Sequence, residues 1–317
     1  MLFSKDMIIS HPFSGEDDLY LLKDFVTSVM ANDMRHSYWH VGDLLWGIYK
    51  DTIFDPRQNI RLWENEQGEL LSFTWINAHE VVLQVSPRFR GSHLNDLLLE
   101  EMLAWGEERQ RKPLADTGTE SVPSFCAFED DFPLIDLFTR HKYGRDEIHD
   151  LHMSRDLNLP IPEAVLPEGW TIRYVGGEDE FDERVALHRE VWQRSKVTLE
   201  AYRRMRRVAG YTPELELVAV APGGTFASYC ICWLDPVNKI GEFEPVGTHS
   251  AYRGKGLGKI VMLEGLRRLK AFGMQTAIVC SLGSNEASKK LYASVGFRTY
   301  NKLYNYTRPQ RKSGYSG

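Results

Sequence analysis

Long apolar runs and cysteines are both scarce in this chain of 317 residues. No run approaches the length of about 18 apolar residues that a membrane helix needs, and Met1 to Ser10 lacks the long apolar region of a signal peptide. Four cysteines are too few and too scattered for a disulfide framework. We therefore expect a cytoplasmic protein in a reducing compartment, without membrane contact.

An excess of positive charge is also missing. The net charge of −6 disfavours extended nucleic-acid binding, and 43% hydrophobic with 26% charged residues is typical of a globular protein. Cys230 and Cys232 alternate on one face of an expected strand, where they pack as small apolar groups rather than bind a metal. We expect no metal, and a length sufficient for two ordinary domains.

The most informative segment that is present is glycine-rich and runs from Arg253 to Lys259. An extended segment, 242–248, precedes it, and apolar residues at helical spacing follow from Leu257 to Phe272. Glycines let backbone N–H groups approach a ligand closely, and a helix N-terminus adds unpaired donors and a favourable dipole. The segment therefore predicts a cradle for a phosphate or pyrophosphate.

Two familiar phosphate loops do not fit this segment. A Walker loop requires Ser or Thr after Gly-Lys, whereas Gly254-Lys255 is followed by Gly256, and a Rossmann loop belongs near the start of a βαβ unit. The pattern Arg253-x-x-Gly256-x-Gly258 resembles the Arg/Gln-x-x-Gly-x-Gly/Ala signature of the GNAT acyltransferase superfamily. The resemblance implies that the loop holds the pyrophosphate of acetyl-CoA; the alternative is a glycine-rich turn without a ligand.

A second segment, from Asn285 to Phe297, resembles the superfamily element Asn-x-x-Ala/Ser-x-x-Leu-Tyr-x-x-x-Gly-Phe. Asn285 is expected to cap a short helix and Gly296 to end it in a left-handed conformation. The resemblance implies that Tyr292 protonates the departing CoA thiolate, although a packed core aromatic is the plain alternative. The cofactor-binding residues it implies are Val246, Gly247, Thr248, Arg253, Gly254, Lys255, Gly256, Leu257, Gly258, Lys259, Asn285 and Ser288.

An internal repeat sets the expected domain organisation. The segment 85–95 aligns at a constant offset with 248–258, and strand-like and helix-like segments on either side align as well. We expect an α/β (α+β) protein with two tandem GNAT-like domains, each a mixed, splayed central sheet of six or seven strands flanked by helices. The domains are 1–157 and the catalytic 170–317, joined by the proline-rich linker 158–169. Residues 214–248 should form antiparallel strands, with the strand near Thr276 parallel to the one that ends at Thr248.

The first copy lacks residues that the chemistry would need. His93 and Asn95 replace Gly256 and Gly258, Phe138 replaces Tyr292, and Asp131 replaces Asn285. Side chains in the loop obstruct an approaching pyrophosphate, and phenylalanine has no proton to give. We expect this domain to have lost cofactor binding and to serve a structural role or to form one wall of the substrate cleft.

Acylation of an amine requires a base, because an alkylammonium with a pKa of about 10.4 is not a nucleophile at neutral pH. Glu242 and Glu244 alternate onto one face of the strand that leads into the loop. Gly241-Glu242-x-x-x-Val246-Gly247 resembles the tandem-domain mycothiol synthases, which favours Glu242 as the base and ranks Glu244 second. A solvated strand face is the alternative for both glutamates, and His249 is expected to be a core or surface histidine.

The sequence thus predicts an acetyl-CoA-dependent N-acetyltransferase that moves an acetyl group to a primary amine by direct attack in the second domain. The alternative is a non-catalytic acyl-CoA-binding or sensor protein. The acceptor, a small molecule or a peptide amine, is expected near 190–208, where the run Arg203 to Arg207 is by default a solvated helix face and otherwise a site for an acidic acceptor. Tyr211 and Trp233 could add an aromatic wall. The protein is expected to be a monomer or a homodimer.

Overall fold

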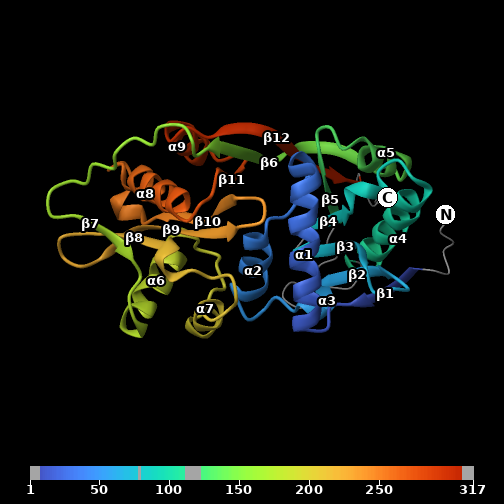
Figure 1. Ribbon diagram of the computed structural model, residues 1–317, viewed down its shortest axis with the longest axis horizontal. Helices are drawn as coiled ribbons and strands as arrows, with labels where there is room; N and C mark the ends of the chain where they lie inside the picture. Colours follow the sequence, from blue (N-terminus) through green and yellow to red (C-terminus); the bar gives the residue numbers. More distant parts are fainter. Residues whose placement is uncertain (1–7, 78–79, 111–122, 309–317) are drawn as a thin grey trace, which may run out of the picture. The chain divides into compact units, whose positions relative to one another are not determined.

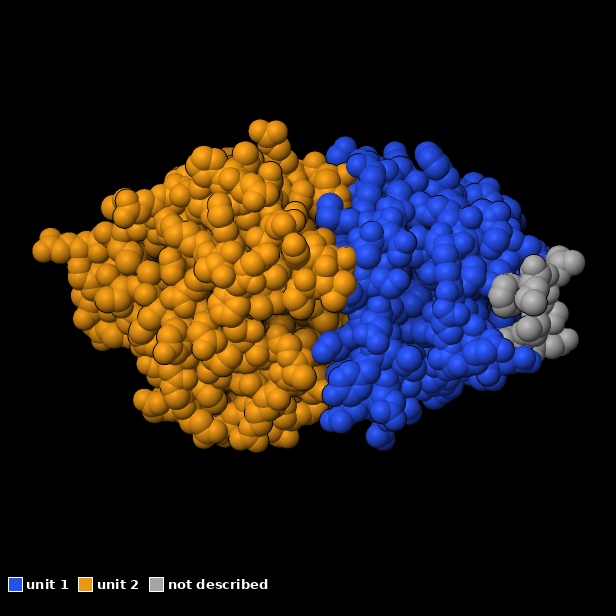
Figure 2. All heavy atoms as spheres, viewed as in Figure 1, with its two compact units in different colours: residues 1–38, 56–150, 301–317 blue, residues 39–55, 151–300 orange. Residues whose placement is uncertain are grey.

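The structure is a computed structural model that describes residues 8–77, 80–110 and 123–308. Its residues group into two compact units (Figure 2). Unit 1 comprises 1–38, 56–150 and 301–317, and unit 2 comprises 39–55 and 151–300. Strands β6 (Gly144–Asp156) and β12 (Arg298–Thr307) have residues in both units.

Unit 1 contains a mixed sheet with helices packed against it (Figure 1). The strand order is β1-β2-β3-β4-β5-β12, in which β4 and β5 are parallel and the other described pairings are antiparallel. Helices α1 and α4 pack on β3, and α4 also packs on β4. The elements are β1 (Ile8–Pro12), α1 (Glu16–Asp33), α3 (Pro56–Asn59), β2 (Ile60–Asn65), β3 (Leu70–Asn77), β4 (Glu80–Val85), α4 (His93–Gln110), β5 (Ser124–Phe128) and α5 (Phe132–Arg140).

Unit 2 repeats this arrangement with the strand order β6-β11-β10-β9-β8-β7. Strands β7 to β10 are antiparallel in succession and β10 is parallel to β11, as the sequence predicts for 214–248 and the strand near Thr276. The elements are α2 (Val41–Tyr49), β7 (Thr171–Tyr174), α6 (Phe181–Val191), α7 (Leu199–Met205), β8 (Glu216–Val220), β9 (Phe226–Asp235), β10 (Ile240–Thr248), α8 (Leu257–Ala271), β11 (Thr276–Leu282) and α9 (Glu286–Ser294).

Strand β10 is covered on both faces within unit 2. Helix α8 lies on one face of the sheet and α6 and α7 on the other (Figure 1). On the α8 face, a Cβ on Gly241 would lie 2.4 Å from a methyl group of Leu269, and a Cβ on Gly265 would lie 2.5 Å from the ring of Phe243. Glycines therefore allow this helix and strand to pack at a distance that larger residues would prevent.

The compact units do not follow chain order. Residues 39–55 from the first repeat, including α2, group with unit 2, and 301–317 from the second repeat group with unit 1. The segment 158–169 contains no helix or strand. The division into 1–157, 158–169 and 170–317 stays a prediction about the tandem copies. None of the described helices is long and apolar enough to cross a membrane.

Replacement of Leu266 by alanine should destabilise unit 2. Leu266 is fully buried on α8 within the apolar core of this unit, and such a substitution typically costs about 2–5 kcal/mol. Denaturant unfolding should report this loss, while Lys270→Ala, an exposed change on the same helix, should alter the free energy of unfolding by less than about 0.5 kcal/mol. Equal effects from the two variants would contradict this account of the core.

Candidate functional site

Strands β10 and β11 pair for only a short distance. Their parallel register runs from Ile240 opposite Thr276 to Glu242 opposite Ile278, and no later pairing joins them among the described residues. On its other edge β10 stays paired with β9 to the end, where Gly247 lies opposite Tyr229 and Thr248 opposite Ser228. Beyond Glu242, the edge of β10 that faces β11 is therefore no longer paired with that strand. Backbone groups on this edge are available to bind a ligand.

The glycine-rich loop joins this strand end to α8. A 3₁₀ turn, Ser250–Tyr252, follows β10, and Gly254 and Gly256 both adopt a positive φ, +78° and +77°. Gly256 is the N-cap residue of α8, and no side chain of the described residues caps this end of the helix. Its first N–H groups are therefore available to an anion, as expected for a phosphate cradle.

A cavity of about 450 Å³ lies between the loop, the end of β10 and α9. Twelve residues predicted from the sequence line it, namely Val246, Gly247, Thr248, Arg253, Gly254, Gly256, Leu257, Gly258, Lys259, Asn285, Ser288 and Tyr292. The lining also includes five residues that were not predicted as cofactor ligands: Val191, Trp192, Tyr252, Ala287 and Leu291. Lys255, Glu242 and Glu244 are not part of the lining; the Lys255 Nζ lies 5.5 Å from the centre of the Tyr252 ring.

Helix α9 is capped as its sequence predicts. The Asn285 side chain accepts a hydrogen bond from the Ser288 N–H at 3.1 Å, and Gly296 has a φ of +92°. The cap fixes the helix so that Tyr292 reaches the cavity while most of its side chain is buried. Burial, with the nearby Glu244 charge, raises the pKa of the Tyr292 phenol well above its ordinary value. The phenol therefore keeps its proton at neutral pH.

Glu242 lies beneath α2 and is almost completely buried. Its Oε2 atom lies 3.0 Å from His40 Nδ1, and the exposed fractions of the two side chains are 3% and 1%. Burial, and then the charge of Glu244, raise the pKa of Glu242 to about 8, although hydrogen bonds from Asp43 lower it. A solvated strand face, the alternative reading for this residue, is wrong because the carboxyl group has almost no contact with solvent.

Glu244 is less buried than Glu242, and its charge acts on a residue of the cavity lining, Tyr292. Its charge acts on the phenols of Tyr292 and Tyr229 as well as on Glu242. The Trp233 indole N–H donates to the Glu244 carbonyl oxygen at 2.6 Å, which holds the strand at this irregular point of its register. Both glutamates thus remain candidates for a base, in different environments.

Two groups of residues escape the sequence analysis. His40 and Asp43 contact Glu242 although they belong to the first repeat. The only pattern they form in the sequence is the capping box at the start of α2. A capping pattern predicts a helix start but no partner. Val191 and Trp192 fall in the segment expected to hold the acceptor, yet both line the cavity.

The basic run is only partly a solvated face. Arg206 forms a buried ion pair with Glu216 at 3.0 Å, whereas Arg207 is largely exposed. The Tyr211 ring packs edge-on against Trp233 at 6.2 Å. His249 Nδ1 accepts a hydrogen bond from the Ala251 N–H at 3.1 Å and so caps the turn before the loop.

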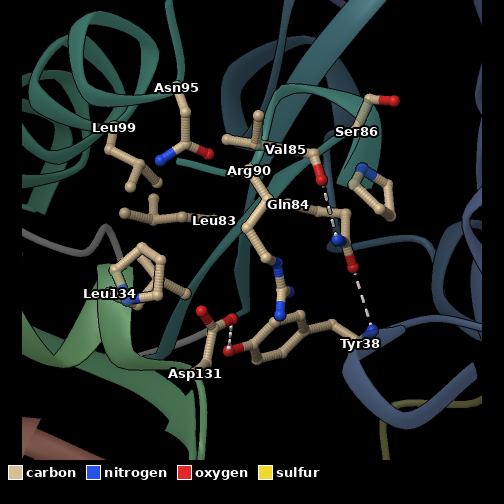
Figure 3. Close-up of a pocket in the computed structure, with 12 residues that line it drawn as sticks. Tyr38, Leu83, Gln84, Val85, Ser86, Arg90, Asn95, Leu99, Asp131 and Leu134 are labelled. Atoms are coloured by element: carbon tan, nitrogen blue, oxygen red, sulfur yellow. Dashed lines mark hydrogen bonds between the residues drawn. The ribbon is translucent and has the colours of Figure 1, made fainter. Parts of the chain in front are cut away.

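The corresponding region of unit 1 is almost filled (Figure 3). The cavity there is about 20 Å³ and is lined by Tyr38, Gln84, Arg90, Asn95 and Asp131, among others. The Asp131 carboxylate, at the N-cap position of α5, accepts a hydrogen bond from the Tyr38 hydroxyl at 3.1 Å. Side chains therefore occupy the space that unit 2 leaves open.

A metal-binding arrangement occurs once in the described part of the chain, at His11, Asp18 and Glu64 of unit 1. His11 Nε2 pairs with Glu64 at 3.0 Å, and Asp18 accepts hydrogen bonds from the N–H and hydroxyl of Ser14. These internal partners account for the cluster.

Open parallel strands, an uncapped glycine-rich helix start and a tyrosine meet at one cavity, an arrangement suited to an extended ligand that carries a phosphate. Residues 179–297 match the acetyltransferase (GNAT) family. The matched residues lie within unit 2, and the chain shares its fold with solved tandem GNAT proteins.

Known proteins resemble the chain over different lengths. It is 27% identical to a mycothiol acetyltransferase of Thermobispora bispora over 72% of this chain and 77% of that protein. It is 29% identical to a mycothiol acetyltransferase of Pseudarthrobacter chlorophenolicus, but this match covers 49% of the chain and about half, 51%, of that relative. A solved tandem GNAT protein from the clavulanic acid biosynthesis pathway shares the fold, with 14% identity, a TM-score of 0.65, and 95% and 98% of the two chains covered.

Replacement of Gly258 by asparagine, the residue of the first copy, should weaken CoA binding. A Cβ at this position would lie 3.2 Å from Thr248 Oγ1 and 3.3 Å from a Leu291 methyl group, so these two side chains would have to move by a few tenths of an ångström beside the loop. We expect the Kd for CoA to rise at least about tenfold, or roughly 1.4 kcal/mol, in isothermal titration calorimetry. Gly223→Ala, where a Cβ meets nothing within 4 Å, is the matched control. Equal affinities for both variants would show that the loop does not contact CoA.

Proposed function

We propose that the protein is an acetyl-CoA-dependent N-acetyltransferase that acetylates a primary amine in unit 2. The observation that carries this proposal is the shared cavity of the glycine-rich loop, the β10 edge and Tyr292. Each of these supplies one need of the reaction: a site for a pyrophosphate, backbone groups for an extended ligand, and a proton donor. Glu242 and Glu244 stand on the strand that enters the same cavity.

Acetyl-CoA would bind as a substrate with its pyrophosphate at the N-terminus of α8. The N–H groups of Leu257, Gly258 and Lys259 and the charge of Arg253 would face the phosphates. Backbone groups from Val246 to Thr248 would pair with the pantetheine chain. Asn285 and Ser288 would act indirectly, since their mutual hydrogen bond fixes the α9 start.

The proposed chemistry is direct attack by the amine on the thioester carbonyl. Glu242, with Glu244 as the second candidate, takes a proton from the ammonium group, directly or through water. A new C–N bond forms while a backbone N–H between Val246 and Thr248 stabilises the carbonyl oxygen as it gains negative charge. The C–S bond then breaks, and the Tyr292 hydroxyl gives its proton to the thiolate. The nitrogen still carries one proton more than the amide product, and this proton returns to the tyrosinate directly or through water.

The acceptor we propose is a small-molecule amine. The printed names of the relatives, mycothiol acetyltransferases, support this class more than a peptide amine. The first copy, 1–157, would have a structural role, because side chains nearly fill its own cavity. All four cysteines are free thiols, which supports a reducing, cytoplasmic setting.

Glu242→Gln should reduce turnover by about 10²- to 10⁴-fold, the usual contribution of a positioned base. The Kd for CoA should stay nearly the same, because Glu242 does not line the cavity. Release of CoA thiol from acetyl-CoA, followed against a panel of amines, measures the rate, and Tyr292→Phe tests the acid in the same assay. Tight CoA binding without thiol release across a broad panel would favour an acyl-CoA-binding protein instead.

The pH profile should separate the two glutamates. A base must be ionised, and the Glu242 pKa of about 8 means that kcat/KM should rise about tenfold per unit below pH 8. Removal of the Glu244 charge lowers the Glu242 pKa, so Glu244→Gln should move the rise to lower pH with the same amine. A loss of activity at every pH in Glu244→Gln, with Glu242→Gln still active, would identify Glu244 as the base.

A further inference from the structure

Helix α2 brings two polar residues of the first repeat onto Glu242. Within unit 2 this helix packs against β9, β10 and α7. His40 Nδ1 contacts Glu242 Oε2 at 3.0 Å, and the Asp43 backbone N–H and carboxyl also bond to the Glu242 carboxyl group. The contact joins residues 202 positions apart in the chain. No residue of the glycine-rich loop or of α9 contributes to it.

The close approach depends on a glycine. A Cβ on Gly42 would lie 2.4 Å from Glu242 Oε2 and 2.5 Å from Cγ of Trp233. Both distances are shorter than real Cβ contacts, so a larger residue would push α2 away from the carboxyl group. The segment His40-Val41-Gly42-Asp43 is therefore shaped to hold its two polar side chains against Glu242.

The capping box at the start of α2 restrains these side chains. His40 Nδ1 accepts from the Gly42 N–H at 3.0 Å, and Asp43 Oδ2 accepts from the His40 N–H at 2.8 Å. A ring nitrogen that accepts from Gly42 cannot also donate to Glu242. The contact thus has two states. In the first, the Glu242 carboxyl group carries the proton and donates a hydrogen bond to Nδ1. In the second, Nδ1 carries the proton and donates a hydrogen bond to the Glu242 carboxylate.

We propose that His40 and Asp43 are positioning residues for Glu242: they hold its carboxyl group in place and control where the proton of the cluster resides. The inference rests on the proposed function, in which Glu242 is the base. A hydrogen bond from His40 or Asp43 stabilises the ionised carboxylate, the form that accepts a proton from the ammonium group. Neither residue lines the cavity.

The electrostatics of the site agree with this geometry. Burial lowers the pKa of His40 and raises those of Asp43 and Glu242, so each group favours its neutral form. The other groups that face the cluster are Asp235 at the end of β9, Glu244 on β10 and Tyr300 on β12. Because Asp43, Glu242 and Glu244 lie close together, the hydrogen bonds that Glu242 accepts influence which of these carboxyl groups ionises first as the pH rises.

The test is the pH dependence of His40→Asn. Asparagine retains an acceptor for the Gly42 N–H and so preserves the cap, but it presents an oxygen instead of a ring N–H to Glu242. The Glu242 pKa should therefore rise, and the pH profile of kcat/KM should move up by about 0.5 to 1 unit. At pH 7 this corresponds to an activity about 3- to 10-fold lower. The Kd for CoA should not change.

Asp43 offers a rescue experiment. Asp43→Ala removes a donor to Glu242 and should move the profile in the same direction, whereas Asp43→Asn, whose amide can still donate, should restore most of the wild-type profile. His11→Asn is the matched control, because His11 also pairs with a glutamate at 3.0 Å but lies in unit 1. Its profile should coincide with that of the wild type.

A second readout does not depend on activity. In protein labelled with ¹³C-glutamate, the carboxyl signal that disappears in Glu242→Gln should titrate near pH 8, and its midpoint should rise in His40→Asn and Asp43→Ala. Unchanged midpoints in both variants would overturn the positioning role even if Glu242→Gln is inactive. Shifted midpoints together with an active Glu242→Gln would keep the cluster but refute Glu242 as the base of the proposed function.

Discussion

The short parallel pairing between β10 and β11 is the constraint on which the rest of unit 2 depends. The two strands share a ladder only from Ile240 to Glu242, and β10 continues to Thr248 with β9 alone. Hydrogen-bonding groups of a strand must find partners, so the open edge of β10 suits an extended ligand. The helix that connects the strands, α8, begins at the same end and directs its free N–H groups there. Splayed strands and an uncapped helix thus create one cavity together.

The same strand carries packing on one face and polar groups on the other. Gly241 and Phe243 face α8, while Glu242 faces α2, as alternation along a strand requires. Close packing on the α8 face fixes β10 in position. On the opposite face, Gly42 lets α2 approach closely enough to bury the Glu242 side chain. This burial, together with the nearby charge of Glu244, raises the pKa of the Glu242 carboxyl group.

Much of this unit could be predicted from the sequence because the signals are local. Glycines in Arg253 to Lys259, the capping residue Asn285 and the alternation around Glu242 each specify a conformation within a few residues. The strand pairing from β8 to β11 agrees with the extended segments expected from the sequence. The residues that line the cavity were implied by the family resemblance that these segments carry. The role of α2 could not be predicted in this way. Its pattern, a capping box before an apolar run, specifies a helix start and says nothing of a carboxylate 202 residues away.

The two copies differ in how their cavities are filled rather than in their strand pairing. Both have antiparallel strands followed by a parallel one, β4 with β5 and β10 with β11. In unit 1 the Tyr38 hydroxyl donates a hydrogen bond to Asp131, and the cavity that both residues line measures about 20 Å³. In unit 2 the Asn285 side chain caps α9. Tyr292 on the same helix lines an open cavity of about 450 Å³. The parallel ladder is short in both copies, from Glu80 to Val81 and from Ile240 to Glu242, so side chains rather than strand pairing distinguish the filled cavity from the open one.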